Sequence, residues 1–295
     1  MLSEDKIISI YCFVDDLLKN FGWQEDIRRK VSDSEIITTA IVSALYFGGH
    51  SDNGRHFMKM TGLCPRMLDK SRFNRRLHGL SDFLFQLFFQ VGHHLKTIAG
   101  ASDYVIDSFP VAVCDNIRIS RCRLLKGEQW RGKHASMRWY FYGVKVQVLT
   151  TVSGIPVEFG FVPGSESDVQ ALKKLPMSVA PESSIYGDSV YTDYTIEDDV
   201  MEAEMVKLLI QRKSNSQRKD EPWMRFLKEH MRKGIETTFS MLKGLFLRKI
   251  HAVTFKGFLL KLIMFIVAFI RGPSRPPLAH RGRWRRCARC PGRAA

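Results

Sequence analysis

The chain has 295 residues and a mass of 34.0 kDa, which suits one large domain or two modest ones. Hydrophobic residues make up 45% and charged residues 25%, which excludes a disordered or fibrous chain. The longest apolar run, 258–270, is interrupted by Lys261 and falls short of the roughly 20 residues that span a bilayer, so we expect no membrane segment. The N-terminus carries acids and lacks the apolar region of a signal peptide, which favours a cytoplasmic location.

The chain is strongly basic, with a formal net charge of +15. Eight arginines and no acid lie in residues 271–295, which leaves +7 on the remainder. This charge favours a polyanionic partner such as nucleic acid, and a merely soluble basic protein is the alternative. The six cysteines are scattered, and the Cys287-x-x-Cys290 pair lacks the further ligands that a zinc site needs, so we expect reduced thiols.

Residues 1–100 are predicted to form an all-helical domain. Apolar residues at three- and four-residue spacing indicate two amphipathic helices, and two shorter segments with a turn lie between them. A capping box of Ser32 and Glu35 would start the first helix. The predicted helical segments are 35–47, 53–60, 69–77 and 81–99.

The two short helices could form a helix-turn-helix unit that binds DNA. The second of them carries Arg72, Arg75 and Arg76, which could present cations to a DNA groove. The alternative is a plain helical bundle whose arginines face water. The sequence does not decide between the two.

Near residue 100 the hydrophobic period changes from that of helices to that of strands. The segment 104–110 is a short apolar strand, and 140–151 and 157–162 alternate in the manner of a hairpin. Further strands are predicted at 184–186 and 205–210, and helices at 168–175 and 222–246. Strands first and interleaved helices later indicate a mixed α/β domain over residues 101–271.

Three acids in this region are candidates for catalysis. Asp107 lies inside an apolar strand, where an unpaired carboxylate is costly. Asp188 follows a short strand, and Glu236 lies at the border between the polar and apolar faces of the last long helix. Carboxylates can bind two divalent cations that clamp the attacking and leaving oxygens of a phosphodiester, and Mg²⁺ prefers such oxygen ligands. The alternative is three unrelated solvated or salt-bridged acids.

These residues, in this order, resemble the catalytic domain of DDE transposases from bacterial insertion sequences. The matching pieces are Asp107 in a strand, Asp188 in YGDSVYTDY and Glu236 in RKGIETTFSMLK. Arg232, Glu236 and Lys243 fit the family pattern of Arg, three residues, Glu, six residues and Lys. The helical segment before residue 100 also resembles the N-terminal part of this group.

The resemblance implies an RNase H-like fold, a mixed sheet flanked by helices, and an enzyme that moves DNA. Asp107, Asp188 and Glu236 would be the catalytic residues and would hold two Mg²⁺ ions, with Mn²⁺ able to substitute. The enzyme would cut the strands at the ends of an insertion element and join them to target DNA. Two alternatives stay open, a nuclease of the same fold that cuts without joining and a non-catalytic basic DNA-binding protein.

The partner implied by the resemblance is double-stranded DNA, both element ends and target, bound by a homodimer in a nucleoid-associated complex. Arg232 and Lys243 share the face of Glu236 and could contact phosphates near the scissile bond. Pairing of these cations with acids in the same helix is an equal alternative.

A second basic cluster precedes the predicted hairpin. Arg131, Lys133 and Arg138 could bind the DNA backbone, with Trp130 or Trp139 available to stack on a base. A solvated loop is the equal alternative.

Residues 272–295 are rich in Arg, Pro and Gly, have no apolar period, and are predicted to be a disordered tail. Nothing in this tail resembles the family. Read-through of a disrupted reading frame and a genuine basic arm for DNA are the two explanations.

Overall fold

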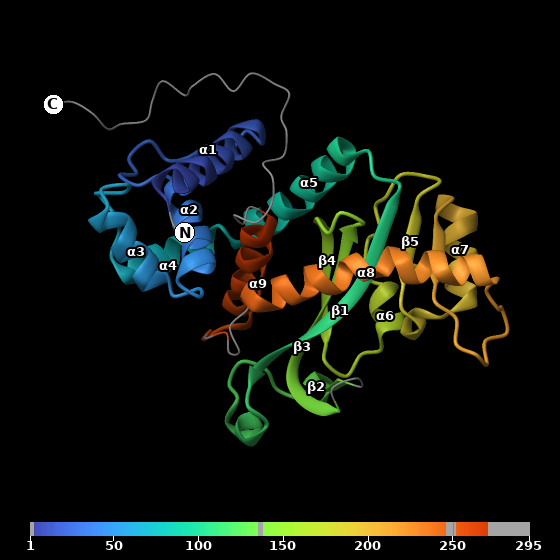
Figure 1. Cartoon of the computed structure of the whole chain (residues 1–295). Coiled ribbons are helices and arrows are strands. Elements are labelled where there is room, and N and C mark those ends of the chain that lie inside the picture. The colour runs from blue at the N-terminus through green and yellow to red at the C-terminus, as the bar shows by residue number, and fades with distance from the viewer. Residues whose placement is uncertain (1–2, 135–137, 246–249, 251, 271–295) are drawn as a thin grey trace.

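The computed structural model describes residues 3–134, 138–245, 250 and 252–270 (Figure 1). The helices are α1 (Glu4–Asn20), α2 (Asp33–Tyr46), α3 (Ser51–Met60), α4 (Lys70–Gly79), α5 (Ser81–Ala99), α6 (Asp168–Leu172), α7 (Tyr194–Glu204), α8 (Pro222–Leu245) and α9 (Phe255–Ile270). The strands are β1 (Asp103–Cys114), β2 (Arg131–His134), β3 (Trp139–Thr151), β4 (Pro156–Pro163), β5 (Ser184–Gly187) and β6 (Lys207–Ile210). Short 3₁₀ helices are η1 (Asn116–Arg121), η2 (Glu128–Trp130) and η3 (Ser189–Tyr191).

The capping box predicted for α2 is present. The Ser32 hydroxyl accepts a hydrogen bond from the Glu35 amide at 3.0 Å, and the Glu35 carboxylate accepts one from the Ser32 amide at 2.7 Å. Gly48 and Gly49, which follow the helix, both have positive φ, a backbone conformation that glycine adopts without strain. The local sequence therefore sets both ends of α2.

The described strands form one six-stranded sheet in which β3 lies beside β1, followed by β5 and β6. β3 is antiparallel to β1, whereas β5 is parallel to β1 and β6 is parallel to β5. β2 and β4 both pair with the outer side of β3, β2 with its first residues and β4 with the hairpin segment that follows. The predicted β3–β4 hairpin and mixed α/β sheet are confirmed.

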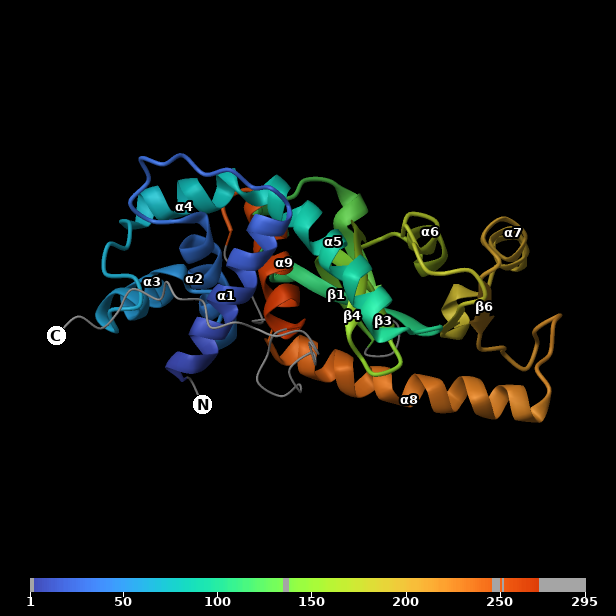
Figure 2. The same cartoon turned by 90° about the horizontal axis from the view of Figure 1, so that it is seen from above.

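Helices cover both faces of the sheet (Figure 2). The long helix α8 crosses one face, where Phe239 packs edge-on against Phe109 of β1 with ring centroids 5.5 Å apart. α6 and α7 lie on the opposite side in the view of Figure 2. α5 follows the outer edge of β4, and the buried Lys96 of α5 forms an ion pair with the buried Glu158 of β4.

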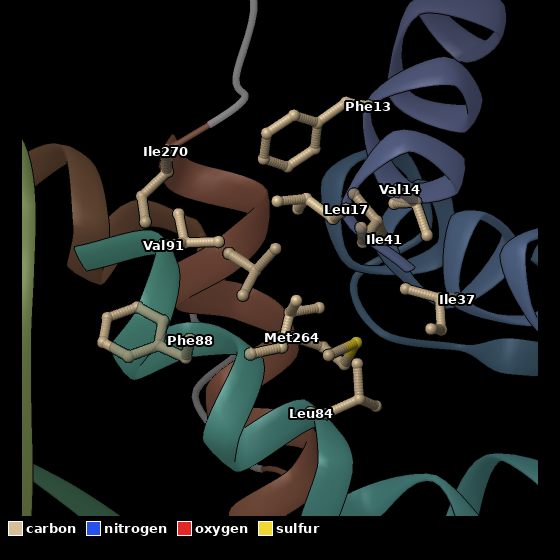
Figure 3. A pocket seen from close by; sticks show the side chains of 12 residues that line it. Phe13, Val14, Leu17, Ile37, Ile41, Leu84, Phe88, Val91, Met264 and Ile270 are labelled. Atoms are coloured by element: carbon tan, nitrogen blue, oxygen red, sulfur yellow. The ribbon is translucent and has the colours of Figure 1, made fainter. Parts of the chain in front are cut away.

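The C-terminal helix α9 packs among the N-terminal helices, mainly against α2 and α5 (Figure 3). Apolar side chains of four helices meet there: Phe13, Val14, Leu17, Ile37, Ile41, Leu84, Leu87, Phe88, Val91, Met264, Val267 and Ile270. The boundary between a helical domain of residues 1–100 and a sheet domain of residues 101–271 stays a prediction. α9 lies in the second range by sequence and contacts helices of the first.

None of the described helices has the length and the apolar character that a membrane span requires. The tail predicted for residues 272–295, together with Cys287 and Cys290, lies outside the described residues.

Candidate active site

Two of the three candidate acids belong to or follow two neighbouring strands, since Asp107 lies in β1 and Asp188 follows the last residue of β5. β1 and β5 are parallel, and their register pairs Asp103 with Ser184 and Val105 with Tyr186. Extended by two residues beyond its last pair, this register would bring Asp107 level with Asp188. That the two carboxylates share one site stays a prediction.

Asp107 lies on the face of the sheet that α8 covers. Side chains two residues apart in a strand point to the same face, and Phe109 of β1 contacts Phe239 of α8. The Asp107 carboxylate accepts a hydrogen bond from the Ser108 amide at 2.7 Å and is partly buried. Burial raises the pKa of the nearby Tyr191 well above its usual value, and the negative charges of Asp107 and Asp168 raise it further.

Asp188 follows the last residue of β5 and caps η3. Its carboxylate accepts a hydrogen bond from the Ser189 amide at 2.6 Å, and its side chain is 40% exposed. On α8, Arg232 Nη1 lies 3.6 Å from Asp188 Oδ1 and donates to Gln211 Oε1 at 2.6 Å. Among the ion pairs between described residues, the partner of Arg232 is Asp188, a candidate site residue, rather than an acid of the same helix.

α8 crosses three adjacent strands, β6, β5 and β1, in that order. Lys228 donates to the Ile210 carbonyl of β6 at 2.9 Å, Arg232 reaches Asp188 after β5, and Phe239 contacts β1. Glu236 lies one helical turn after Arg232, between the β5 and β1 contacts. Its side chain is exposed.

The three acids do not form a closed metal cage. Within the described part of the chain, no group of three or more His, Cys, Asp or Glu side chains is close enough to hold a metal ion. The assignment of Asp107, Asp188 and Glu236 as joint metal ligands therefore stays a prediction, supported by the strand register and by the position of Glu236 on α8.

A polar network supports β1 from the other face of the sheet. Ser108 donates to Asp168 Oδ1 at 2.6 Å, Lys145 Nζ lies 3.3 Å from Asp168 Oδ2, and Gln147 donates to the Asp168 carbonyl at 3.1 Å. Asp168 is the first residue of α6, and the N-cap is Ser167, whose hydroxyl accepts from the Gln170 amide. The Asp168 carboxylate thus binds α6 to β1 and β3.

Arg76 does not face solvent as a groove-contacting arginine would. Its guanidinium donates to the Val31 carbonyl at 2.5 Å and to Asp33 Oδ1 at 2.7 Å, and its side chain is 14% exposed. The helical pattern could not reveal this because the partners lie 43 to 45 residues away. Arg72 and Arg75 of the same helix are exposed, and Arg72 pairs with Asp69 at 3.2 Å.

The basic cluster near the hairpin lies on β2 and at the start of β3. The side chains of Arg131, Lys133 and Arg138 are exposed, as is Tyr140, over whose ring Lys133 Nζ lies at 5.6 Å. Trp139 is 38% exposed. Arg131 and Lys133 thus belong to β2 and Arg138 directly precedes β3, while DNA binding by this cluster stays a prediction.

Trp130 lies differently from Trp139, because its ring packs against Phe255 with centroids 5.5 Å apart. Of the two tryptophans considered for base stacking, Trp139 is the exposed one. Lys243 belongs to α8, and its side chain lies outside what the structure describes.

Gln211 is a site residue that the sequence did not single out. It follows β6 directly, its amide donates to the Gly187 carbonyl at 3.0 Å, and its side chain holds Arg232. Its position directly after a predicted strand could have identified it, because polar residues at the ends of adjacent parallel strands meet at one edge of a sheet.

The chain matches the transposase DDE domain family over residues 99–252, just over half of its length, and it belongs to this family. Neither the comparison with curated proteins nor the one with solved structures finds a match. The matched range contains β1, β5 and the whole of α8, and with them all three candidate acids. Domains of this family bind DNA and generally use divalent metal.

Proposed function

We propose that the protein is an insertion-sequence transposase that cuts the DNA strands at element ends and transfers them to target DNA. The strand order β4, β3, β1, β5 and β6, with three antiparallel strands followed by two parallel to β1, supports an RNase H-like fold for the sheet domain. The observation that supports the proposal most directly is the parallel pairing of β1 with β5, whose continuation would bring Asp107 level with Asp188, together with the 3.6 Å separation of Arg232 on α8 from Asp188.

The donor set suits a hard divalent ion such as Mg²⁺, because carboxylate oxygens are its preferred protein ligands. Asp107 and Asp188 would hold the ion, and Glu236 would complete the set from α8. Two ions bound there would stabilise the charge that develops on the attacking and leaving oxygens of the phosphodiester. The chain's own residues position the carboxylates, and the Asp168 network keeps β1 fixed behind Asp107.

DNA would contact the exposed cations on both sides of this site. Arg131, Lys133 and Arg138 would contact DNA phosphates from the sheet. Arg72 and Arg75 would do so from α4. Lys243 would add a contact from α8. Because its guanidinium is tied to Asp33, Arg76 is left out of this surface.

Three substitutions test the site. We expect Asp107→Asn, Asp188→Asn and Glu236→Gln each to lower cleavage of a labelled duplex from the DNA bordering the gene by at least about a hundredfold, since each removes a metal ligand. Binding of the same duplex should survive, because it depends on Lys and Arg contacts to phosphate. Asp199→Asn on α7, an exposed acid away from the site, is the matched control.

The products separate the alternatives. Strand-transfer products joined to a second duplex would support a transposase, whereas nicks without joining would support a nuclease of the same fold. Full activity in all three acid variants would refute the site and leave a non-catalytic DNA-binding protein.

A further inference from the structure

Arg232 contacts the candidate site with only part of its guanidinium engaged. Nη1 donates a short hydrogen bond to Gln211 Oε1 at 2.6 Å, whereas its 3.6 Å separation from Asp188 Oδ1 is longer than a hydrogen bond. The side chain is only 16% exposed, and its buried Nε has no hydrogen-bond partner within the described residues. Gln211 is therefore the firm anchor of this cation, and Asp188 is a looser one.

Gln211 is well placed to hold the guanidinium whatever happens at Asp188. The pairing of β6 with β5 fixes its backbone, because its amide donates to the Gly187 carbonyl at 3.0 Å. The Gln211 side-chain oxygen carries no formal charge. A metal ion bound to the carboxylates would therefore leave the hydrogen bond between Gln211 and Arg232 in place. Lys228, one turn earlier on α8, binds the Ile210 carbonyl and Asp220 and holds the helix against the same strand ends.

The charge balance gives Arg232 a role in the absence of metal. Under the proposed function Asp107 and Asp188 would lie side by side, and two adjacent carboxylates repel each other. The guanidinium offsets the charge of Asp188. A divalent cation bound to the same carboxylate would be repelled by the nearby positive charge.

We propose that Arg232 is the resident counter-ion of Asp188 in the metal-free protein. A divalent cation that binds Asp107 and Asp188 displaces the guanidinium from Asp188, while Gln211 retains it. This inference rests on the proposed function, since it assigns the metal to these acids. It adds that the metal must compete with a residue of the chain itself.

The displaced guanidinium would be free to bind DNA. Arginine has five donors in a planar fork, so Nη2 can donate to a phosphate oxygen while Nη1 stays on Gln211. Metal binding would then favour phosphate binding by Arg232, and by reciprocity DNA would raise the affinity for metal. The residue would link loading of the ion to the presence of the substrate.

The test is a Mn²⁺ titration of the full chain without DNA. The electron paramagnetic resonance signal of the free ion measures how much Mn²⁺ is bound. We expect Arg232→Gln to bind Mn²⁺ about fivefold more tightly than the unaltered chain, the gain typical of removing one partly exposed ion pair. Arg225→Gln is the matched control, because Arg225 is 75% exposed on the same helix and pairs with Glu229. In an Asp188→Asn background, Arg232→Gln should have no effect.

Unchanged or weaker Mn²⁺ binding by Arg232→Gln would overturn the inference, and so would an equal gain in Arg225→Gln or in the Asp188→Asn background. A gain of affinity cannot arise from unfolding, so a damaged variant cannot mimic the expected result. DNA cleavage that needs Asp188, with Mn²⁺ affinity insensitive to Arg232, would refute this inference and leave the proposed function standing. If Arg232→Gln tightens Mn²⁺ binding as expected but the chain cleaves no DNA, the proposed function is refuted and the counter-ion role of Arg232 stands.

Discussion

Asp33 shows how a single buried carboxylate organises the N-terminal helices. It is fully buried at the start of α2 and accepts hydrogen bonds from Arg76 at 2.7 Å, Arg29 at 2.8 Å and Trp23 Nε1 at 3.0 Å. These donors come from α4 and from the segment between α1 and α2. One side chain thus fixes three parts of the chain relative to one another.

We expect Asp33→Ala to lower the free energy of unfolding by about 3–5 kcal/mol, because it leaves the Arg76 guanidinium buried without its counter-charge. Urea unfolding followed by circular dichroism measures the change. Asp26→Ala is the control, since Asp26 and Arg28 pair at the surface and such pairs contribute no more than about 1 kcal/mol. Equal effects of the two substitutions would contradict the role assigned to Asp33.

The sequence predicted the local position of a residue better than it predicted the residue's contact partner. The sequence predicted Asp107 inside a strand and Asp188 directly after one, and both positions are confirmed. Arg76 was misplaced because a helical pattern gives the face of a side chain, not the distant residue that meets it. Gln211 escaped notice because a glutamine after a strand is chemically unremarkable until Arg232 is seen beside it.

At the scale of elements, α5 lies so close to β4 that one glycine decides the contact. A methyl group on Gly92 would lie 1.9 Å from the Val157 carbonyl oxygen, well inside van der Waals contact. We expect Gly92→Ala to destabilise the fold by about 1–3 kcal/mol, although alanine is the better helix former. Thermal unfolding measures this change.

Gly79→Ala provides the comparison, because a methyl group there would meet nothing within 4 Å at the end of α4. That variant should keep or slightly raise the melting temperature, as the helix propensity of alanine predicts. A Gly92→Ala protein as stable as Gly79→Ala would show that α5 can move away from β4 without cost.

Most elements followed from the sequence where one physical signal dominated. The capping box fixed the start of α2, and alternation of β-branched and aromatic residues predicted β3 and β4. α7 was missed because its sequence, YTIEDDVMEAE, is mostly polar and buries few apolar residues. β2 was missed because RGKH has no apolar alternation, and only its pairing with β3 makes it a strand.

At the scale of the whole molecule, α9 lies late in the chain but packs against helices formed by the first hundred residues. Met264 is buried among apolar residues of α1, α2 and α5 (Figure 3). We expect Met264→Ala to lower the free energy of unfolding by roughly 2–5 kcal/mol and to speed amide hydrogen exchange in α1 and α2. Mass spectrometry of peptides from these helices measures the exchange.

Lys256→Ala serves as the control on the same helix, since Lys256 is exposed and pairs only at the surface with Asp82. It should change stability by less than about 1 kcal/mol. Exchange in α1 and α2 that stays unchanged in Met264→Ala would mean that the N-terminal helices do not depend on α9.

The position of α9 also orders events during synthesis. α1, α2 and α5 leave the ribosome long before residues 255–270, so part of their apolar surface stays uncovered until nearly the whole chain has been made. A product terminated early in α8 would expose that surface and would be a substrate for chaperones and proteases. The N-terminal helices are thus poorly suited to persist in a product that lacks α9.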